Sequence, residues 1–215
     1  FDILGLASLR MMEGAIQHIL KRHHNVENPT FKEVKQYYDE NLHPDVIDMN
    51  DQNIYKNVFH EGKWAGIFQF TETGAQNFCK RVQPENIIDL AAVTSIFRPG
   101  PLSAKVDKYY INARRNPEDI EYSCDEAKEV TEATSGFLIF QEQIAALAHK
   151  LGKDLSLDEG NMLRKVLTKK GTGKGAEVKE RLYKKFVEGC KEKNFTIGEA
   201  NELWDKFEYF SGYGF

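Results

Sequence analysis

The chain has 215 residues, 41% of them hydrophobic, and a formal net charge of -4. These values are ordinary for a globular protein, and no apolar run is long enough to cross a bilayer. The three cysteines, Cys79, Cys124 and Cys190, are widely spaced, and the six histidines lack zinc-ligand spacing. Composition thus excludes a membrane-spanning protein and a disulfide-stapled one, and it predicts a cytoplasmic protein.

Neither end of the chain resembles the end of a folded protein. The sequence begins with Phe1 rather than methionine, and its first six residues form an apolar run with one acid, Asp2. The last six residues, Phe-Ser-Gly-Tyr-Gly-Phe, carry no polar tail. We therefore expect the chain to be a fragment of a larger protein.

Hydrophobic periodicity predicts a mainly α-helical fold with two or three short strands. The expected strands are the first residues of the chain, residues 64–70 and residues 136–140. We expect Thr30 with Glu33, and Thr196 with Glu199, to form capping boxes at helix starts. The helices are expected at residues 6–24, 30–38, 51–60, 71–82, 84–97, 102–115, 125–134, 141–151, from Ser156 into the following basic segment, 176–193 and 196–210.

Two connections have a distinctive composition. Arg98-Pro-Gly-Pro101 predicts a rigid turn between two helices, and it places a cation on that turn. The alternative is simple helix punctuation. Residues 171–175, Gly-Thr-Gly-Lys-Gly, predict a flexible linker. This stretch is not a Walker phosphate loop, because a helix precedes it and glycine follows its lysine.

Residues 161–174 concentrate positive charge in an acidic protein. The segment contains no acid and five cations, Arg164, Lys165, Lys169, Lys170 and Lys174. Some of these cations share a face if the segment is helical, which suits a polyphosphate or a nucleic-acid backbone. The alternative is a solvated, lysine-rich helix end.

Two further sites each have a functional and a structural interpretation. Asp2 lies in an apolar strand-like run, where it would face solvent on an edge strand or bind a metal ion. Gln141 and Gln143 flank Glu142 at a helix start that follows an apolar stretch. Their amides could contact a base or a sugar, or Glu142 could simply stabilise the helix N-terminus.

Six segments occur in an order that is similar to one protein family. The chain resembles the C-family replicative DNA polymerases, the bacterial DNA polymerase III alpha subunits, over nearly its whole length. The segments are Phe1-Asp-Ile-Leu-Gly-Leu6, Gly66-Ile-Phe-Gln-Phe70, Phe97-Arg-Pro-Gly-Pro-Leu102, Phe140-Gln-Glu-Gln143, Met162-Leu-Arg-Lys165 with Lys169-Lys170, and Phe210-Ser-Gly-Tyr-Gly-Phe215.

The resemblance implies a division of the chain and a set of site residues. Residues 1–24 would end the palm domain, with Asp2 as its third catalytic carboxylate and as a ligand of magnesium. The other two carboxylates would lie upstream, so the two-metal site would be completed outside this chain. Residues 25–215 would form the helical fingers domain. The implied nucleotide-binding residues are Arg98, Gln141, Gln143, Arg164, Lys165, Lys169 and Lys170.

The resemblance also implies the reaction and the partners. The family transfers a nucleotide from a deoxynucleoside triphosphate to a DNA primer-template, with magnesium ions. The implied partners are the DNA, the triphosphate and the remainder of the polymerase, with a sliding clamp and other replisome proteins bound by absent regions. The isolated chain is expected to be inactive.

The sequence departs from the family pattern at two positions. Lys165 stands where a second arginine is usual, which replaces a bidentate fork by a point charge. Phe140 stands where tyrosine is common. The alternative function is a non-catalytic helical module that binds nucleic acid through its basic segment.

Overall fold

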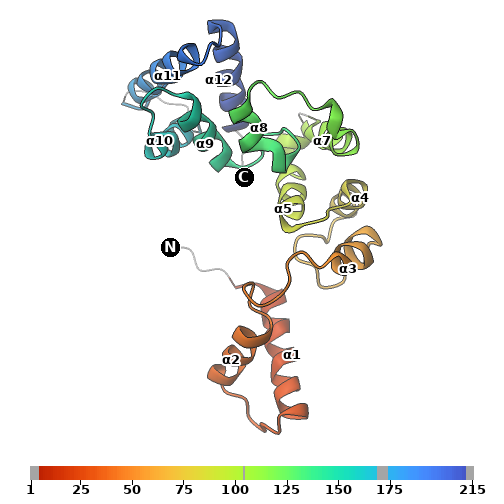
Figure 1. Ribbon diagram of the computed structural model, residues 1–215. Helices are drawn as coiled ribbons and strands as arrows, with labels where there is room; N and C mark the ends of the chain where they lie inside the picture. The colour runs from red at the N-terminus through yellow and green to blue at the C-terminus, as the bar shows by residue number, and fades with distance from the viewer. Residues whose placement is uncertain (1–4, 104, 169–173, 212–215) are drawn as a thin grey trace. The chain divides into compact units, whose positions relative to one another are not determined.

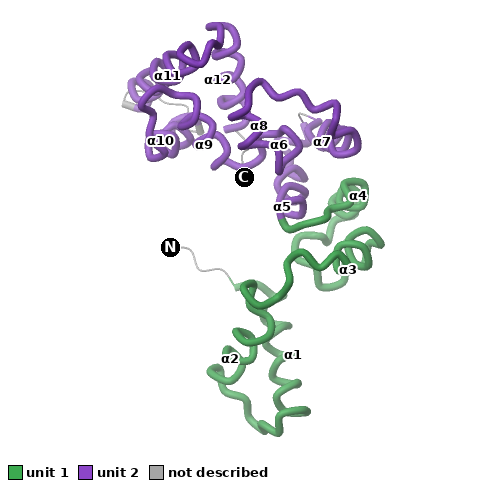
Figure 2. Tube along the Cα trace, in the orientation of Figure 1, with its two compact units in different colours: residues 1–87 green, residues 88–215 purple. Residues whose placement is uncertain are grey.

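The computed structural model describes residues 5–103, 105–168 and 174–211. Its described residues form α-helices, short 3-10 and π-helical turns and loops, with no β-strand among them. The chain divides into two compact units, Phe1–Ile87 and Ile88–Phe215 (Figures 1 and 2). The predicted helical class is therefore confirmed, whereas the strands predicted at residues 64–70 and 136–140 are wrong. The first predicted strand lies mostly outside the described residues.

The first unit begins with a helical hairpin. Ile16 and Leu20 of α1 and Val34 of α2 form its small buried core. Figure 1 shows the two helices side by side. The predicted capping box at Thr30 is present, because Thr30 N–H donates to the Glu33 carboxylate at 2.7 Å and Glu33 N–H donates to Thr30 Oγ1 at 3.4 Å. The elements of this unit are α1 (Ala7–His23), α2 (Phe31–Asn41), α3 (Gln52–Ile54), a π-helical turn (Tyr55–His60) and α4 (Thr73–Val82).

Residues 64–70 form successive turns instead of a strand. The Trp64 and Phe70 rings stack with centroids 5.4 Å apart, which folds the segment back on itself. Gly66 and Gln69 have positive φ angles of 78° and 64°. Positive φ is incompatible with an extended strand, so ring packing rather than strand pairing holds this run. Phe70 is buried, whereas Phe68 is 53% exposed.

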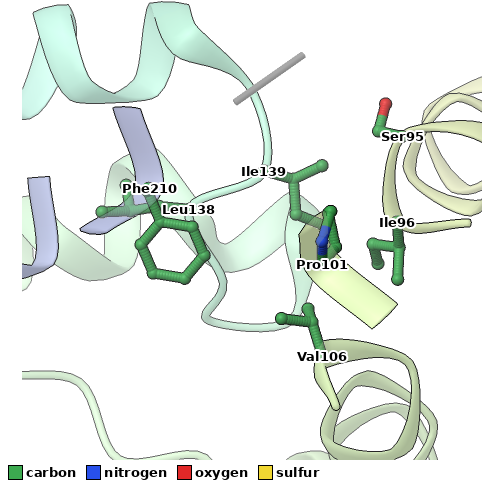
Figure 3. Close-up of a pocket in the computed structure, with 7 residues that line it drawn as sticks. All are labelled: Ser95, Ile96, Pro101, Val106, Leu138, Ile139 and Phe210. Carbon is green, nitrogen blue, oxygen red and sulfur yellow. The ribbon is translucent and has the colours of Figure 1, made fainter. Parts of the chain in front are cut away.

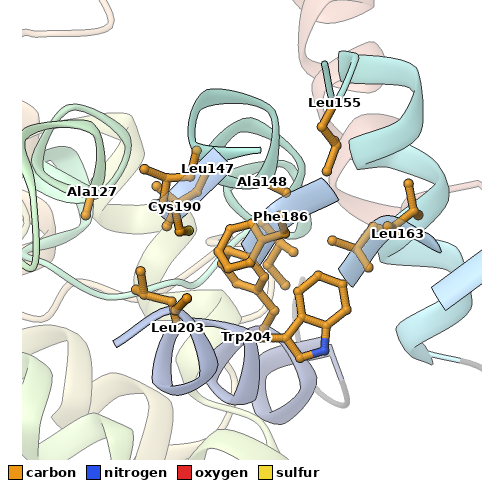
Figure 4. Close-up of a cluster of buried hydrophobic side chains, with 14 of the residues drawn as sticks. Ala127, Leu147, Ala148, Leu155, Leu163, Phe186, Cys190, Leu203 and Trp204 are labelled. Atoms are coloured by element: carbon orange, nitrogen blue, oxygen red, sulfur yellow. The ribbon is translucent and has the colours of Figure 1, made fainter. Parts of the chain in front are cut away.

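The second unit contains the remaining helices. Its longest elements, α9 to α12, surround the largest hydrophobic cluster in the described part of the chain (Figure 4). The Phe186 ring lies at the centre of this cluster, with centroids 5.5 Å from Trp204 and 5.3 Å from Phe207. The elements are α5 (Ile87–Ile96), α6 (Pro99–Ser103), α7 (Val106–Arg115), a 3-10 turn (Pro117–Asp119), α8 (Asp125–Thr131), a 3-10 turn (Glu132–Thr134), α9 (Gln141–Leu151), α10 (Leu157–Thr168), α11 (Lys174–Glu192) and α12 (Ile197–Ser211).

Several predicted boundaries in this unit change. The turn at Arg98-Pro-Gly-Pro101 is instead largely the short helix α6, because the Leu102 N–H donates to the Arg98 carbonyl. The expected helix at residues 102–115 is divided, since Lys105 adopts a left-handed conformation before α7. Gly175 belongs to α11 rather than to a linker. Residues 171–173 of the predicted linker lie outside the described residues.

Candidate functional site

The basic segment begins on α10, where Arg164 faces the start of α9. Arg164 Nη1 donates to Gln141 Oε1 at 2.9 Å and to Glu142 Oε1 at 3.1 Å. The Arg164 side chain is only 24% exposed, whereas that of Glu142 is 72% exposed. The structure thus brings together two of the predicted nucleotide-binding residues, Arg164 and Gln141, from segments more than twenty positions apart.

Glycine permits the close approach of α10 to α9 that this contact requires. A Cβ atom at Gly160 would lie 2.5 Å from the Ala145 carbonyl oxygen, a distance that side chains essentially never adopt. Ser156 caps α10 as predicted, because its hydroxyl accepts from the Glu159 N–H at 3.2 Å. The start of α10 is therefore fixed against the middle of α9, one turn before Arg164.

The next helix, α11, holds α10 from the other side. Lys185 Nζ lies 2.8 Å from Glu159 Oε2 and donates to the Asp154 carbonyl at 2.9 Å. The hydrogen bond from Lys185 holds the pKa of the Glu159 carboxyl below its usual value. A Cβ atom at Gly189 would lie 2.2 Å from the Leu151 carbonyl oxygen, so α11 also packs directly on the end of α9. Three helices thus determine where Arg164 points.

Gln143 is buried, and its amide is used within the protein. Its Oε1 accepts from the backbone N–H groups of Ile139 (2.8 Å) and Phe140 (2.9 Å), and its Nε2 donates to Thr134 Oγ1 (2.7 Å) and the Val130 carbonyl (3.1 Å). Successive N–H groups of a strand point to opposite sides, so two that donate to one oxygen do not belong to an extended strand. Residues 137–140 accordingly form no strand.

Two of the segments that carry the family resemblance meet at a small apolar cavity, together with the residues just before a third (Figure 3). The cavity has a volume of about 10 Å³. Pro101 comes from the proline-rich segment, Leu138 and Ile139 precede α9, and Phe210 lies near the end of α12. Because the polar group of its lining, the Ser95 hydroxyl, already donates to the Ala91 carbonyl, packing rather than hydrogen bonding joins these segments here.

Arg98 is exposed at the junction of α5 and α6. A buried ion pair links α5 to α7, the helix after α6, because Arg114 Nη1 lies 2.7 Å from Asp89 Oδ1. The Asp89 side chain is only 2% exposed, so removing Arg114 would leave a buried charge. This ion pair restrains the helices before and after the segment that contains Arg98.

Lys165 is exposed on α10 directly after Arg164. Asp2, Lys169 and Lys170 lie outside the described residues. Within the described residues, no group of three or more His, Cys, Asp or Glu could hold a metal ion, so they do not form a magnesium site by themselves. No helix in the described part is long and apolar enough to cross a membrane.

Sequence reasoning missed two charged residues beside this site. The sequence indicates Glu142 as a favourable acid at a helix start, but in the structure it also contacts Arg164. Arg181 of α11 lies beside α10, with its Nη2 3.8 Å from Glu159 Oε1. The position of Glu142 between two glutamines that are candidate site residues could have indicated its role. No feature of the sequence around Arg181 indicates that it lies beside α10.

The cysteines behave as the sequence predicts. All three are free thiols. Burial raises the pKa of the Cys79 and Cys190 thiols to about 12, which keeps them protonated and unreactive. The Cys124 sulfur accepts from the Ala127 N–H at 3.3 Å and caps α8. None of them is a candidate nucleophile.

The arrangement at α9 and α10 favours an anion. Backbone N–H groups at the start of α9 carry partial positive charge, and the guanidinium of Arg164 lies against the same turn. Arg164 Nε is buried and has no hydrogen-bond partner in the part of the chain that the structure describes. A guanidinium beside a helix N-terminus can bind a phosphate group.

Comparison with known proteins identifies the family. Residues 13–194 match the bacterial DNA polymerase III alpha subunit finger domain. The whole chain aligns with DNA polymerase III subunit alpha of Campylobacter jejuni (30% identity over 215 residues) and of Bacillus subtilis (29% over 216 residues). It covers 16% and 17% of those two proteins, respectively. The chain therefore belongs to the finger-domain family of the bacterial DNA polymerase III alpha subunit.

Proposed function

We propose that this chain is the fingers region of a replicative DNA polymerase and that Arg164 binds the triphosphate of the incoming deoxynucleotide. The observation that carries the proposal is the contact of Arg164 with the first turn of α9 at 2.9 and 3.1 Å. This contact holds the Arg164 guanidinium in one position at the N-terminus of α9. The remaining cations of the segment, Lys165, Lys169 and Lys170, would extend the positive surface along the nucleotide or the DNA.

The domain division follows from the same proposal. Residues 1–24 would end the palm, and residues 25–215 would form the fingers. Asp2 would bind magnesium together with carboxylates outside this chain, and magnesium would stabilise the attacking and leaving oxygens. The roles assigned below to residues of this chain do not depend on that ion. DNA, the rest of the polymerase, a sliding clamp and other replisome proteins are the proposed partners.

Arg164 would offset negative charge on the triphosphate as pyrophosphate departs. This role is mostly positioning and electrostatics, since the enzyme does little covalent chemistry in phosphoryl transfer. Glu142 competes with the triphosphate for Arg164, because both would accept from the same guanidinium. Its exposure makes this ion pair weak, about 0–1 kcal/mol, so a triphosphate can displace it.

Gln141 and Gln143 have different proposed roles. Gln141 would orient Arg164 and could turn its own amide toward the nucleotide. Gln143 acts as a positioning residue, because four hydrogen bonds already occupy its buried amide. Arg98, exposed on the rigid α5–α6 junction, would contact the nucleotide or the DNA.

Single-turnover nucleotide incorporation by the full polymerase tests the proposal. Replacing Arg164 with alanine should slow incorporation by about 10²–10³-fold, the usual effect of removing one electrostatic contact to the transition state. Arg115→Ala is the matched control, because Arg115 is an exposed arginine on α7, away from α9 and α10 in the sequence. Glu142→Gln should lower the nucleotide concentration needed for half-maximal rate, since it removes the competing carboxylate.

Two results would contradict the proposal. Unchanged incorporation by a folded Arg164→Ala polymerase would exclude Arg164 as a triphosphate ligand. Loss of DNA affinity with unchanged nucleotide dependence would instead support the alternative, a module that binds nucleic acid through its basic segment. Thermal unfolding of the Arg164→Ala and Arg115→Ala polymerases shows whether each variant is folded.

A further inference from the structure

A second group of basic residues lies in the first unit, at the turn that joins α1 to α2. Lys21, Arg22 and His23 form the last turn of α1, and His24 follows as its C-cap. Lys32 is the second residue of α2. All five side chains are exposed. Because α1 and α2 pack side by side and are joined by this short turn, the five residues gather at one end of the hairpin (Figure 1).

The turn also carries the exposed acid Glu27. Among the described residues, however, no carboxylate lies within ion-pair distance of Lys21, Arg22 or Lys32. Glu33, the acid next to Lys32, accepts hydrogen bonds from Thr30 N and Oγ1 at 2.7 Å. In the second unit, by contrast, Lys150 of α9 and the loop residues Lys153 and Lys193 each form an ion pair with a glutamate.

An exposed aromatic ring lies in the same place. Phe31, the first residue of α2, is 77% exposed. The small hairpin core of Ile16, Leu20 and Val34 does not include it. A cation cluster at a helix C-terminus can be explained by the helix dipole alone, but the dipole does not explain an exposed phenylalanine beside it.

Cations beside an exposed ring suit one class of ligand. Single-stranded nucleic acid offers phosphates to the cations and unpaired bases that stack on an aromatic side chain. Duplex DNA offers phosphates, but its bases are already stacked on one another. We infer that the tip of the α1–α2 hairpin, Lys21 to His24 with Phe31 and Lys32, binds single-stranded nucleic acid. This inference does not depend on the role proposed for Arg164.

Fluorescence anisotropy of the 215-residue chain tests this inference, with a labelled oligothymidylate and a duplex of the same length at several salt concentrations. Phe31→Ala should weaken single-strand binding by about fivefold or more while leaving duplex binding unchanged, because stacking is lost. The Lys21→Ala/Arg22→Ala double variant should lower the salt slope of single-strand binding by about 1.4, since each phosphate contact contributes about 0.7.

Matched controls come from the second unit. Tyr109→Ala removes a ring that is 60% exposed on α7, and Lys108→Ala/Arg115→Ala removes two exposed cations from the same helix. Both controls should bind the oligonucleotide like the unaltered chain. Helical circular dichroism should be unchanged in the hairpin and α7 variants, because their substituted residues are exposed.

Three results would overturn the inference. The first is no measurable binding of the oligothymidylate by the unaltered chain. The second is equal single-strand affinity of the chain and its Phe31→Ala variant. The third is that Arg164→Ala/Lys165→Ala abolishes binding whereas the hairpin variants bind as tightly as the unaltered chain. That result would assign the nucleic acid to α10 instead.

Discussion

The α1–α2 hairpin and the α9–α12 bundle are built by the same local rules but differ in core size. Both contain a Thr-x-x-Glu capping box, at Thr30 in the hairpin and at Thr196 in the bundle. The hairpin buries three hydrophobic residues, whereas fifteen of the described residues form the cluster that the bundle surrounds. Local signals thus define where helices begin, but core size decides how firmly they are held.

This difference matches the two proposed roles. The bundle fixes Arg164 through three packed helices and two close glycine contacts, as a preorganised phosphate site requires. The hairpin presents cations and a ring on a weakly packed support, which suits sequence-tolerant binding.

The largest effect is expected at the centre of the bundle. Phe186 is 0% exposed and contacts the rings of Trp204 and Phe207. Phe186→Ala should therefore lower the free energy of unfolding by about 3–5 kcal/mol. Urea unfolding followed by fluorescence would measure it. A loss below about 1 kcal/mol would show that the cluster is not a single packed core.

A smaller loss is expected where α11 contacts the end of α9. A Cβ at Gly189 would lie 2.2 Å from the Leu151 carbonyl oxygen and 2.3 Å from the Lys153 nitrogen. Gly189→Ala should destabilise the bundle by about 1–3 kcal/mol, because backbone must shift. Gly175→Ala in the same helix is the control, since it meets no atom within 4 Å and should be neutral or stabilising. Equal effects of the two variants would refute the close contact.

In the hairpin, Leu20→Ala should cost about 2 kcal/mol, but only locally. Leu20 is 6% exposed within a core that is separate from the bundle cluster. Amide hydrogen exchange should become faster in α1 and α2 and stay unchanged in α9 to α12. Faster exchange throughout the chain would show that the hairpin and the bundle unfold as one cooperative unit.

The smallest effect concerns acid pH at the shared capping boxes. Hydrogen bonds from the backbone N–H groups of Thr30 and Thr196 lower the pKa of Glu33 and Glu199. A lowered folded-state pKa stabilises the fold above the unfolded value of about 4.3, and this contribution is lost as pH falls through the folded value.

Stability should therefore decrease below roughly pH 4.3, and Glu199→Gln should reduce that dependence. Fluorescence of Trp204, which lies on α12, would report it during urea titrations at several pH values. An unchanged pH profile in the variant would show that Glu199 does not contribute.

Much of the helix pattern could be predicted, because capping is encoded within four residues. The boxes at Thr30 and Thr196 and the Ser156 cap are present as predicted. The predicted strands failed because tertiary contacts decided those segments. Ring stacking of Trp64 on Phe70 turns one run, and the Gln143 amide satisfies the backbone of the other.

The sequence offers a set of candidate site residues but not their arrangement. The segment order pointed to Arg164 and Gln141, yet nothing local showed that Gln141 contacts Arg164 or that Gln143 is buried. Those facts depend on how closely α10 approaches α9, which Gly160 permits. The Asp89–Arg114 pair likewise joins residues that are 25 positions apart.

The central claim is that Arg164 contacts the triphosphate, and photocrosslinking tests it most directly. A deoxynucleotide with a photoreactive group on its γ-phosphate would be bound to the full polymerase with primer-template, irradiated, and the modified peptide sequenced. Crosslinking to the α10 peptide that contains Arg164 and Lys165, suppressed by excess unmodified nucleotide, is the predicted result. Crosslinking confined to peptides outside α9 and α10 would contradict the account.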